Sequence, residues 1–156
     1  MDRLFERTKT IKYFKLDKMW DFCTDENNVG IDEKWYEKFP EKNEKMLVPS
    51  CWNTTIGYFR YMGVAWYRTY FETSTENIWL KFEAVANECT VYIDGKRIGY
   101  HYGCFTEFGF ENLNIGAGVH EIIVRVDNKI NLADTIPHIL TDWYNSRNIA
   151  MLTNGS

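Results

Sequence analysis

The stretch CTVYIDGKRIG, residues 89–99, combines the two signals that decide the fold. Its first half, CTVYI, alternates apolar and other residues with a period of two, which is typical of a strand with one buried face. Asp94 and Gly95 then form a dipeptide typical of a two-residue hairpin turn, which requires a positive φ at both central positions. The stretch therefore predicts two antiparallel strands joined by a tight turn.

The same period of two recurs on both sides of this hairpin. It is present in VAWYRTYF (64–71), in NIWLKFEAV (77–85) and in VHEIIVRVDN (119–128). The segment NIGAG (114–118) supplies a turn with two glycines before the last of these strands. Short strands with frequent turn signals and almost no helix predict an all-β sandwich or barrel with antiparallel strands.

The N-terminal part of the chain has weaker patterns. Residues 1–15 form a charged lead-in without clear periodicity, and MWDF (19–22) alternates weakly. IDEKWYEKF (31–39) suits either one or two helical turns or a charged loop. The domain is therefore expected to occupy residues 16–156.

Composition excludes several classes of partner. The formal net charge is -4 and the Lys and Arg residues are scattered, which argues against nucleic acid. No apolar run approaches the roughly 20 residues of a membrane-spanning helix, and the N-terminus lacks the apolar core of a secretory signal. We therefore expect a cytoplasmic protein that contacts no membrane.

The four cysteines do not form a metal-binding pattern. Cys23, Cys51, Cys89 and Cys104 include no C-x-x-C pair. In a reducing compartment, such cysteines are expected to be small buried apolar residues. We therefore predict neither a metal nor any other cofactor.

LTDWYN (140–145) is the segment whose residue types best suit a ligand. Asp142 is followed by Trp143, Tyr144 and Asn145. Aromatic rings next to a carboxylate suit a sugar, which has apolar C–H faces and a rim of hydroxyls. In the alternative, structural interpretation, Asp142 caps a turn and the aromatic residues fill an edge of the core.

Several stretches, taken in order, resemble one family. They are WDFCTDENNVGIDEKWYEKF (20–39) with LVPSCWN (47–53), GVAWYRTYF (63–71), FEAVANECTVYIDGKRIGYHYGCFTEFGFE (82–111), and VRVDN (124–128) followed by DTIP and DWYN. Together they resemble the family 2 glycoside hydrolases, and within that family the β-glucuronidase and β-galactosidase branch. The family usually has glycines after the DWY motif, whereas this chain has Asn145, Ser146 and Arg147.

The resemblance implies a fold and a domain order. It implies an antiparallel jelly-roll β-sandwich, similar to galactose-binding domains, which is the N-terminal sugar-binding domain of these enzymes. In the family, an immunoglobulin-like domain and a TIM barrel follow, and the barrel carries both catalytic Glu residues of a retaining β-glycosidase. These domains are absent from the 156 residues, so we expect no catalytic residue and no activity from this chain alone.

The resemblance also assigns a role to Asp142. An Asp at this position in the family reaches the active site of the barrel and binds hydroxyls of the sugar that is cleaved, and Trp143, Tyr144 and Asn145 accompany it here. The expected partners are therefore the non-reducing-end sugar of a β-glycoside and the missing domains of the parent enzyme. A stand-alone carbohydrate-binding module and an interaction or homo-oligomerisation domain are the alternatives.

Overall fold

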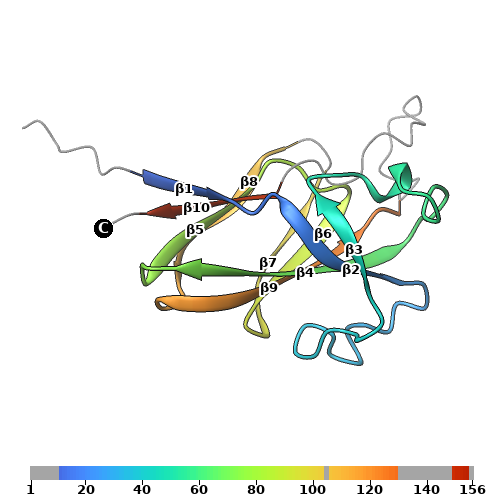
Figure 1. Cartoon of the computed structure of the whole chain (residues 1–156), viewed down its shortest axis with the longest axis horizontal. Coiled ribbons are helices and arrows are strands. Elements are labelled where there is room, and N and C mark those ends of the chain that lie inside the picture. Colours follow the sequence, from blue (N-terminus) through green and yellow to red (C-terminus); the bar gives the residue numbers. More distant parts are fainter. Residues whose placement is uncertain (1–10, 104–105, 130–148, 155–156) are drawn as a thin grey trace, which may run out of the picture.

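The computed structural model describes residues 11–103, 106–129 and 149–154 of the chain, and the side chains of residues 14–103 and 106–129. In this part, the chain forms two antiparallel sheets and a short 3-10 helix, η1 (Trp52–Thr54) (Figure 1). The smaller sheet has the order β1 (Ile11–Lys15), β10 (Ile149–Asn154), β5 (Asn77–Phe82) and β8 (Phe108–Asn114). The larger sheet has the order β3 (Glu44–Val48), β2 (Lys18–Asp25), β4 (Val64–Thr73), β9 (Gly118–Asp127), β6 (Glu88–Ile93) and β7 (Lys96–Tyr102).

The predicted all-β fold is confirmed. Every pairing between these strands is antiparallel. Because β1, β5, β8 and β10 lie in one sheet and the intervening strands in the other, the chain crosses repeatedly between the two layers. This arrangement is the double-sheet jelly roll that the sequence predicted.

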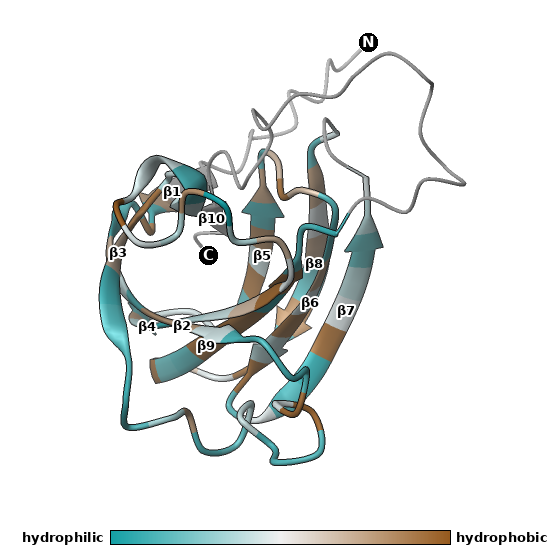
Figure 2. Cartoon of the chain, turned by 90° about the vertical axis from the view of Figure 1, so that its right-hand side faces the viewer, coloured by the Kyte–Doolittle hydropathy of each residue, from teal (hydrophilic) through white to brown (hydrophobic). Residues whose placement is uncertain are grey.

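Alternation of residue type explains how the two sheets pack. In β4, Ala65, Tyr67 and Phe71 point into the core, whereas Trp66 and Arg68 point to the opposite face. Figure 2 shows the strands changing between hydrophobic and hydrophilic along their length, as this alternation requires. One face of each sheet is therefore available to form the interior of the sandwich.

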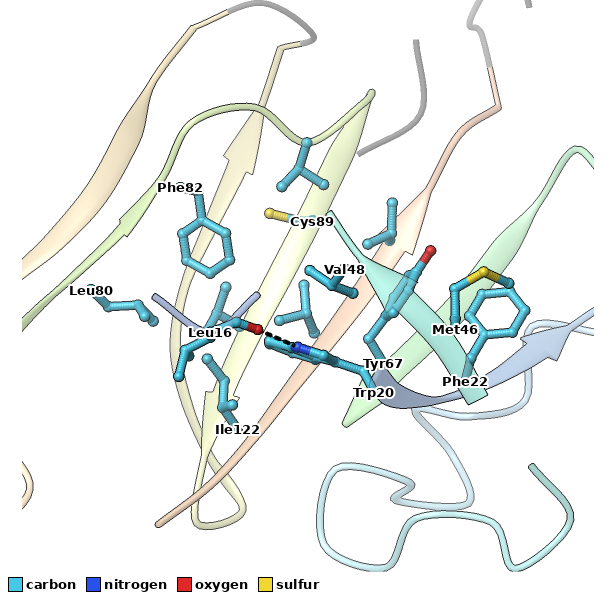
Figure 3. Close-up of a cluster of buried hydrophobic side chains, with 14 of the residues drawn as sticks. Leu16, Trp20, Phe22, Met46, Val48, Tyr67, Leu80, Phe82, Cys89 and Ile122 are labelled. Atoms are coloured by element: carbon cyan, nitrogen blue, oxygen red, sulfur yellow. Dashed lines mark hydrogen bonds between the residues drawn. The ribbon is translucent and has the colours of Figure 1, made fainter. Parts of the chain in front are cut away.

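The main core is rich in aromatic side chains. Trp20 and Tyr67 of the larger sheet and Leu80 and Phe82 of the smaller sheet belong to one cluster, and all four are fully or almost fully buried (Figure 3). The indole N–H of Trp20 donates a hydrogen bond to the carbonyl of Leu16, 2.8 Å away, in the short link between β1 and β2. The buried indole therefore keeps its N–H satisfied while its rings fill the interior.

A second, smaller core lies on the outer face of the larger sheet. There Trp66, Tyr92 and Ile123 are covered by aromatic residues of the connection between β2 and β3, including Phe39. The stretch 31–39, for which helical turns or a charged loop were expected, is a series of tight turns. Lys34 has φ of +54°, which no continuous α-helix accommodates.

The hairpin that decided the fold has the predicted geometry. Asp94 and Gly95 connect β6 to β7 with φ angles of +50° and +76°, as a type I′ turn requires. His101 lies in β7, close to its end at Tyr102. Strand β7 extends to Tyr102 because it pairs with β6 along that strand's whole length.

The two ends of the chain meet in the smaller sheet. Residues 11–15, which the sequence placed in the lead-in, form β1 and pair with β10 from Ile11–Asn154 to Lys15–Ala150. β10 is the strand near the C-terminus, and it lies between β1 and β5. In the part of the chain that the structure describes, no helix is long and apolar enough to span a membrane.

Candidate functional site

The four residues predicted to contact sugar, Asp142, Trp143, Tyr144 and Asn145, lie outside the described residues. The structure does describe the two points between which their segment, residues 130–148, is attached. It follows Lys129, two residues beyond the end of β9, and leads into Ile149 at the start of β10. The candidate site is therefore built from these two attachment points and from the loops beside them.

Asn128 fixes the first attachment point. Its side chain is 3% exposed. The carboxamide oxygen accepts the N–H of Gly63 at 2.7 Å, and the carboxamide nitrogen donates to the carbonyl of Tyr61 at 3.4 Å. The backbone N–H of Asn128 donates to the carbonyl of Gly63 at 3.1 Å. The side chain and the backbone of Asn128 therefore both bind the end of β9 to the loop that precedes β4.

Asn87 holds the same point from a different loop. Its carboxamide nitrogen donates to the carbonyl of Asn128 at 3.3 Å and to that of Lys129 at 3.1 Å. Its backbone N–H donates to the carbonyl of Asp127 at 3.0 Å. Three consecutive carbonyls are thereby bound by one residue, which sets the direction in which the chain leaves β9.

The second attachment point lies at the same end of the sandwich. Ile149 pairs with Phe82, the last residue of β5. Residues 83–87, which include Asn87, connect β5 to β6. Glu88, the first residue of β6, pairs with Asp127. The segment that carries Asp142 therefore both leaves and rejoins the sandwich at the end where residues 83–87 cross between the sheets.

Hydrogen bonds within the loop 51–63 hold its backbone in place beside this region. The carboxamide nitrogen of Asn53 donates to the carbonyls of Tyr58, Phe59 and Tyr61 at 3.0–3.1 Å. Burial raises the pKa of Tyr61 to about 12, so its hydroxyl is protonated and donates to the carbonyl of Val64. A backbone held in this way presents its outward side chains in a defined arrangement.

The outward side chains of this loop are apolar. Ile56, Phe59 and Met62 are 99%, 72% and 45% exposed. Isolated exposed apolar residues are ordinary, but three within seven positions of one well-fixed loop form a local apolar surface. The loop therefore carries three exposed apolar side chains, and Met62 lies between Tyr61 and Gly63, the two residues that Asn128 binds.

Acidic groups also gather at this end of the larger sheet. Glu88 and Asp127 are directly opposite each other on neighbouring strands. The hydroxyl of Tyr100 donates to a carboxylate oxygen of Glu88 at 2.8 Å, and this bond raises the pKa of Tyr100 to about 12. This end of the sheet therefore carries two carboxylates, which can accept hydrogen bonds, with Lys129 close to them in the chain.

The described histidines and cysteines offer no catalytic arrangement. His120 lies between a carboxylate oxygen of Asp94 at 2.6 Å and the carbonyl of Gly116 at 2.9 Å, so it braces the hairpin turn. Burial raises the pKa of Cys23 and of Cys89 to about 12, which keeps both as thiols at neutral pH. Cys23 and Cys89 are buried as expected, Cys51 is only half-buried, and Cys104 lies outside the described residues.

No group of three or more potential metal ligands is present among the residues that the structure describes. Two of the described glutamates have local structural roles. Glu107 forms an ion pair with Lys81, and Glu33 accepts the indole N–H of Trp35 at 2.9 Å. These arrangements stabilise the surface and do not resemble a pair of carboxylates flanking a scissile bond.

Comparison with known proteins identifies relatives. No profile of a known protein family matches the chain. The chain is 30% identical to a β-glucuronidase of Streptococcus agalactiae, in a match that covers 65% of this chain and 17% of that protein. It is 32% identical to a β-galactosidase of Thermoanaerobacter pseudethanolicus, covering 64% of this chain and 15% of that protein. The chain therefore spans less than one fifth of the length of either relative.

Solved structures support the same relationship. A β-glucuronidase from an uncultured Clostridium species matches 100% of this chain with 31% of its own, at 26% identity and a TM-score of 0.80. A Ruminococcus gnavus β-glucuronidase in complex with uronic isofagomine matches 81% of this chain with 23% of its own, at 27% identity and a TM-score of 0.72. This chain is a relative of the β-glucuronidases. The resemblance to the β-glucuronidase and β-galactosidase branch of glycoside hydrolase family 2, predicted from the sequence, is confirmed.

Sequence reasoning found this β-glucuronidase-like fold but missed the residues that shape the candidate site. In the sequence, Asn87 and Asn128 stand within longer motifs. The residues next to them do not indicate that the side chain of Asn87 binds the carbonyl of Asn128. The signal that could have drawn attention to Asn128 is its place at the end of VRVDN, where a polar amide directly follows a buried strand. The predicted roles of residues 142–145 remain predictions.

Proposed function

We propose that this chain is the non-catalytic N-terminal jelly-roll domain of a retaining β-glycosidase of the β-glucuronidase or β-galactosidase type, which acts in carbohydrate breakdown. One observation carries the proposal. Structures of β-glucuronidases match 81–100% of this chain but only 23–31% of their own length. A domain of this kind has a place within a larger enzyme whose catalytic carboxylates lie elsewhere.

Asp142 is the residue through which this domain would contribute to the reaction. An ionised carboxylate accepts hydrogen bonds from two hydroxyls of one sugar, and such charge-assisted bonds are roughly twice as strong as neutral ones. These hydrogen bonds can strengthen as the sugar ring flattens toward the oxocarbenium-like transition state. They then raise the rate of the reaction and not only the affinity for the substrate. Trp143 and Tyr144 would supply apolar faces beside the carboxylate, and Asn145 a further polar group.

The described geometry supports this role through the attachment of the segment. Asn87 and Asn128 fix its start, and the pairing of Ile149 with Phe82 fixes its end, so its 19 residues are tethered twice at one end of the sandwich. Two fixed ends restrict the positions that a side chain within the segment can reach. A tethered segment is suited to deliver one carboxylate to a neighbouring domain.

The test uses the full-length protein encoded by the gene that contains this chain, assayed with aryl β-glucuronides and aryl β-galactosides. We expect Asp142→Ala to lower kcat/KM for the preferred substrate about 100-fold, as for the loss of one preorganised polar contact. Asp32→Ala, in the exposed connection between β2 and β3, is the matched control and should leave kcat/KM unchanged. Equal activity of the Asp142→Ala variant and the wild type would refute the role of Asp142.

The isolated chain separates this proposal from a stand-alone binding module. We expect it to hydrolyse neither substrate, and to show no Asp142-dependent change in Trp fluorescence on titration with glucuronate, galactose or mannose. The reason is that most of the pocket for the terminal sugar would belong to the catalytic domain. A saturable millimolar response that Asp142→Ala abolishes would instead favour the stand-alone module.

A further inference from the structure

Trp79 occupies an unusual position on the outer face of the smaller sheet. Strand β5 alternates, so that Ile78, Leu80 and Phe82 are buried in the core while Trp79 and Lys81 face outward and are half-buried. Among the described residues, Trp79 belongs to neither hydrophobic cluster. Its indole is therefore a surface group rather than part of the interior.

Gly109 of the neighbouring strand β8 makes room for this indole. A Cβ at position 109 would lie 2.8 Å from Nε1 of Trp79 and 2.7 Å from the carbonyl oxygen of Leu80. Any larger residue would displace the ring, so glycine allows the indole to lie across β8. A glycine within a strand often marks such a close approach.

Hydrogen bonding does not explain this placement of the ring. The Nε1 atom of Trp79 is buried and has no hydrogen-bond partner among the described residues. Turning the ring toward solvent would let its N–H reach water, and a buried unpaired donor is costly. The ring thus lies against Gly109 although its N–H group has no hydrogen-bond partner among the described residues.

Polar side chains lie near the ring along β5 and β8, whereas the residue paired with Trp79 in β10 is Leu152. Lys81, two residues along β5, forms an ion pair with Glu107, whose side chain is 57% exposed. Glu111 is exposed two residues beyond Gly109, and Asn77 is exposed two residues before Trp79. An aromatic ring on a sheet face is thus bordered by an ammonium group, carboxylates and an amide.

We propose that this outer face of the smaller sheet is a carbohydrate-binding surface, with Trp79 as its aromatic platform and a β-linked oligosaccharide as its ligand. Pyranose rings joined through equatorial β-linkages form a flat ribbon with apolar C–H faces, which can stack on an indole. Their hydroxyls lie at the edges of the ribbon, within the reach of carboxylate acceptors and ammonium donors on the sheet. By contrast, the outer face of the larger sheet is covered by the chain's own aromatic residues.

This inference goes beyond the proposed function and does not depend on Asp142. The surface lies on β5 and β8, which are neighbouring strands of the smaller sheet (Figure 1). It would hold a polymeric or oligomeric substrate by several sugar units, whereas Asp142 is proposed to contact only the terminal sugar. The two proposals can therefore fail independently.

The test is a calorimetric titration of the isolated chain with cellohexaose, a β-linked probe, and with maltohexaose, an α-linked one. We expect saturable binding of cellohexaose only. Trp79→Ala should bind about tenfold more weakly or below detection, because the platform is lost, and Trp79→Phe should retain part of the affinity. Tyr70→Ala, which removes an aromatic ring that is 48% exposed on the larger sheet, is the matched control and should bind as the wild type does.

A second measurement does not require a variant that keeps its full stability. In a ¹⁵N-labelled wild-type chain, the indole N–H resonance of Trp79, assigned from its absence in Trp79→Phe, should shift progressively with cellohexaose. Failure of cellohexaose to bind, equal binding of maltohexaose, or full affinity in Trp79→Ala would each overturn the proposal. Loss of binding in Asp142→Ala, with Trp79→Ala unaffected, would also overturn it and move the sugar site to the segment 130–148.

Discussion

Single polar residues, rather than the apolar core, decide the local shape at the end of the sandwich. Asn128 satisfies the N–H of Gly63 with its carboxamide oxygen while its own backbone binds the same glycine. Asp25 is 2% exposed and accepts the N–H groups of Val29 and Gly30 and the indole N–H of Trp66 at 2.8–3.0 Å. Neither residue could be assigned this role from the sequence, because the decisive partners lie up to 65 residues away.

Replacing Asn128 tests the first of these anchors. In Asn128→Ala, the buried N–H of Gly63 loses its acceptor, so we expect the free energy of unfolding to fall by about 1–3 kcal/mol. Urea denaturation at 25 °C measures the change, and Asn114→Ala, at an exposed position in β8, is the control. An Asn128→Ala variant as stable as Asn114→Ala would show that the anchor contributes little to folding.

The ionised carboxylate of Asp21 makes a pH-dependent contribution to the free energy of unfolding, and a substitution can measure it. Burial tends to raise the pKa of its carboxyl, but hydrogen bonds from Lys45 and Arg68 and their positive charges outweigh burial and lower it. Arg68 donates from Nε at 2.9 Å and from Nη2 at 2.7 Å to one carboxylate oxygen. Because the folded-state pKa is lowered, this stabilisation is present above the unfolded-state pKa, near 4, and is lost as the pH falls through the folded-state value.

We therefore expect Asp21→Asn to be less stable than the wild type at pH 7 by roughly 1–3 kcal/mol. The difference should shrink as the pH is lowered from 5 toward 2, because the wild-type carboxyl then becomes protonated. Urea denaturation at several pH values measures the difference, and Asp32→Asn, at an exposed position, should show almost none. A gap between Asp21→Asn and the wild type that stays constant down to pH 2 would contradict this account.

At the scale of elements, local signals were predictable and covering loops were not. The Asp94–Gly95 hairpin was predictable because its turn is specified by the two residues that adopt positive φ. The connection between β2 and β3 was not, because its aromatic residues resemble a helical face, whereas their true partners are Trp66 and Tyr92 on the sheet. Contacts with distant strands outweigh the local preference of such a segment.

Gly30 tests how tightly this connection is packed against the sheet. A Cβ at this position would lie 2.6 Å from Nε1 of Trp66 and 2.8 Å from a carboxylate oxygen of Asp25. We expect Gly30→Ala to lower the free energy of unfolding by about 1–3 kcal/mol through overpacking. In a Trp66→Phe background, where the indole nitrogen is absent, the same substitution should cost less. Equal costs in the two backgrounds, measured by urea denaturation, would show that the clash is not with Trp66.

For the whole molecule, alternation along the strands predicted an all-β sandwich or barrel, and the order of the motifs indicated the family, whose resemblance implied the two-layer jelly roll. Alternation does not indicate which strands are neighbours in space. It therefore could not predict that β1 pairs with β10, which comes from the opposite end of the chain. The charged residues of 11–15 also masked a strand, because an edge strand commonly carries lysines that discourage pairing with other chains. The site was harder to predict because its geometry depends on loops from three separate parts of the sequence.

Pairing between the ends of the chain gives a prediction about its boundaries. β1 contributes five residue pairs to the edge of the smaller sheet and leads through Leu16, which is buried and accepts the indole N–H of Trp20. Deleting residues 1–15 would leave β10 as an unprotected edge, and we expect a loss of roughly 2–3 kcal/mol in the free energy of unfolding, after the ordering entropy of the strand is subtracted. Deleting only residues 1–10 is the matched control, because it removes none of these contacts.

Urea denaturation of both deletions and of the full chain measures this loss, and amide hydrogen exchange locates it. Exchange in β10 should accelerate in the 1–15 deletion and remain slow in the 1–10 deletion, because only the former removes the strand paired with β10. If both deletions were as stable as the full chain, residues 11–15 would be a dispensable lead-in and the domain would begin at Leu16. If only the longer deletion is destabilised, the domain begins at Ile11, and the closing pair of strands also restrains the C-terminal end of the segment that carries Asp142.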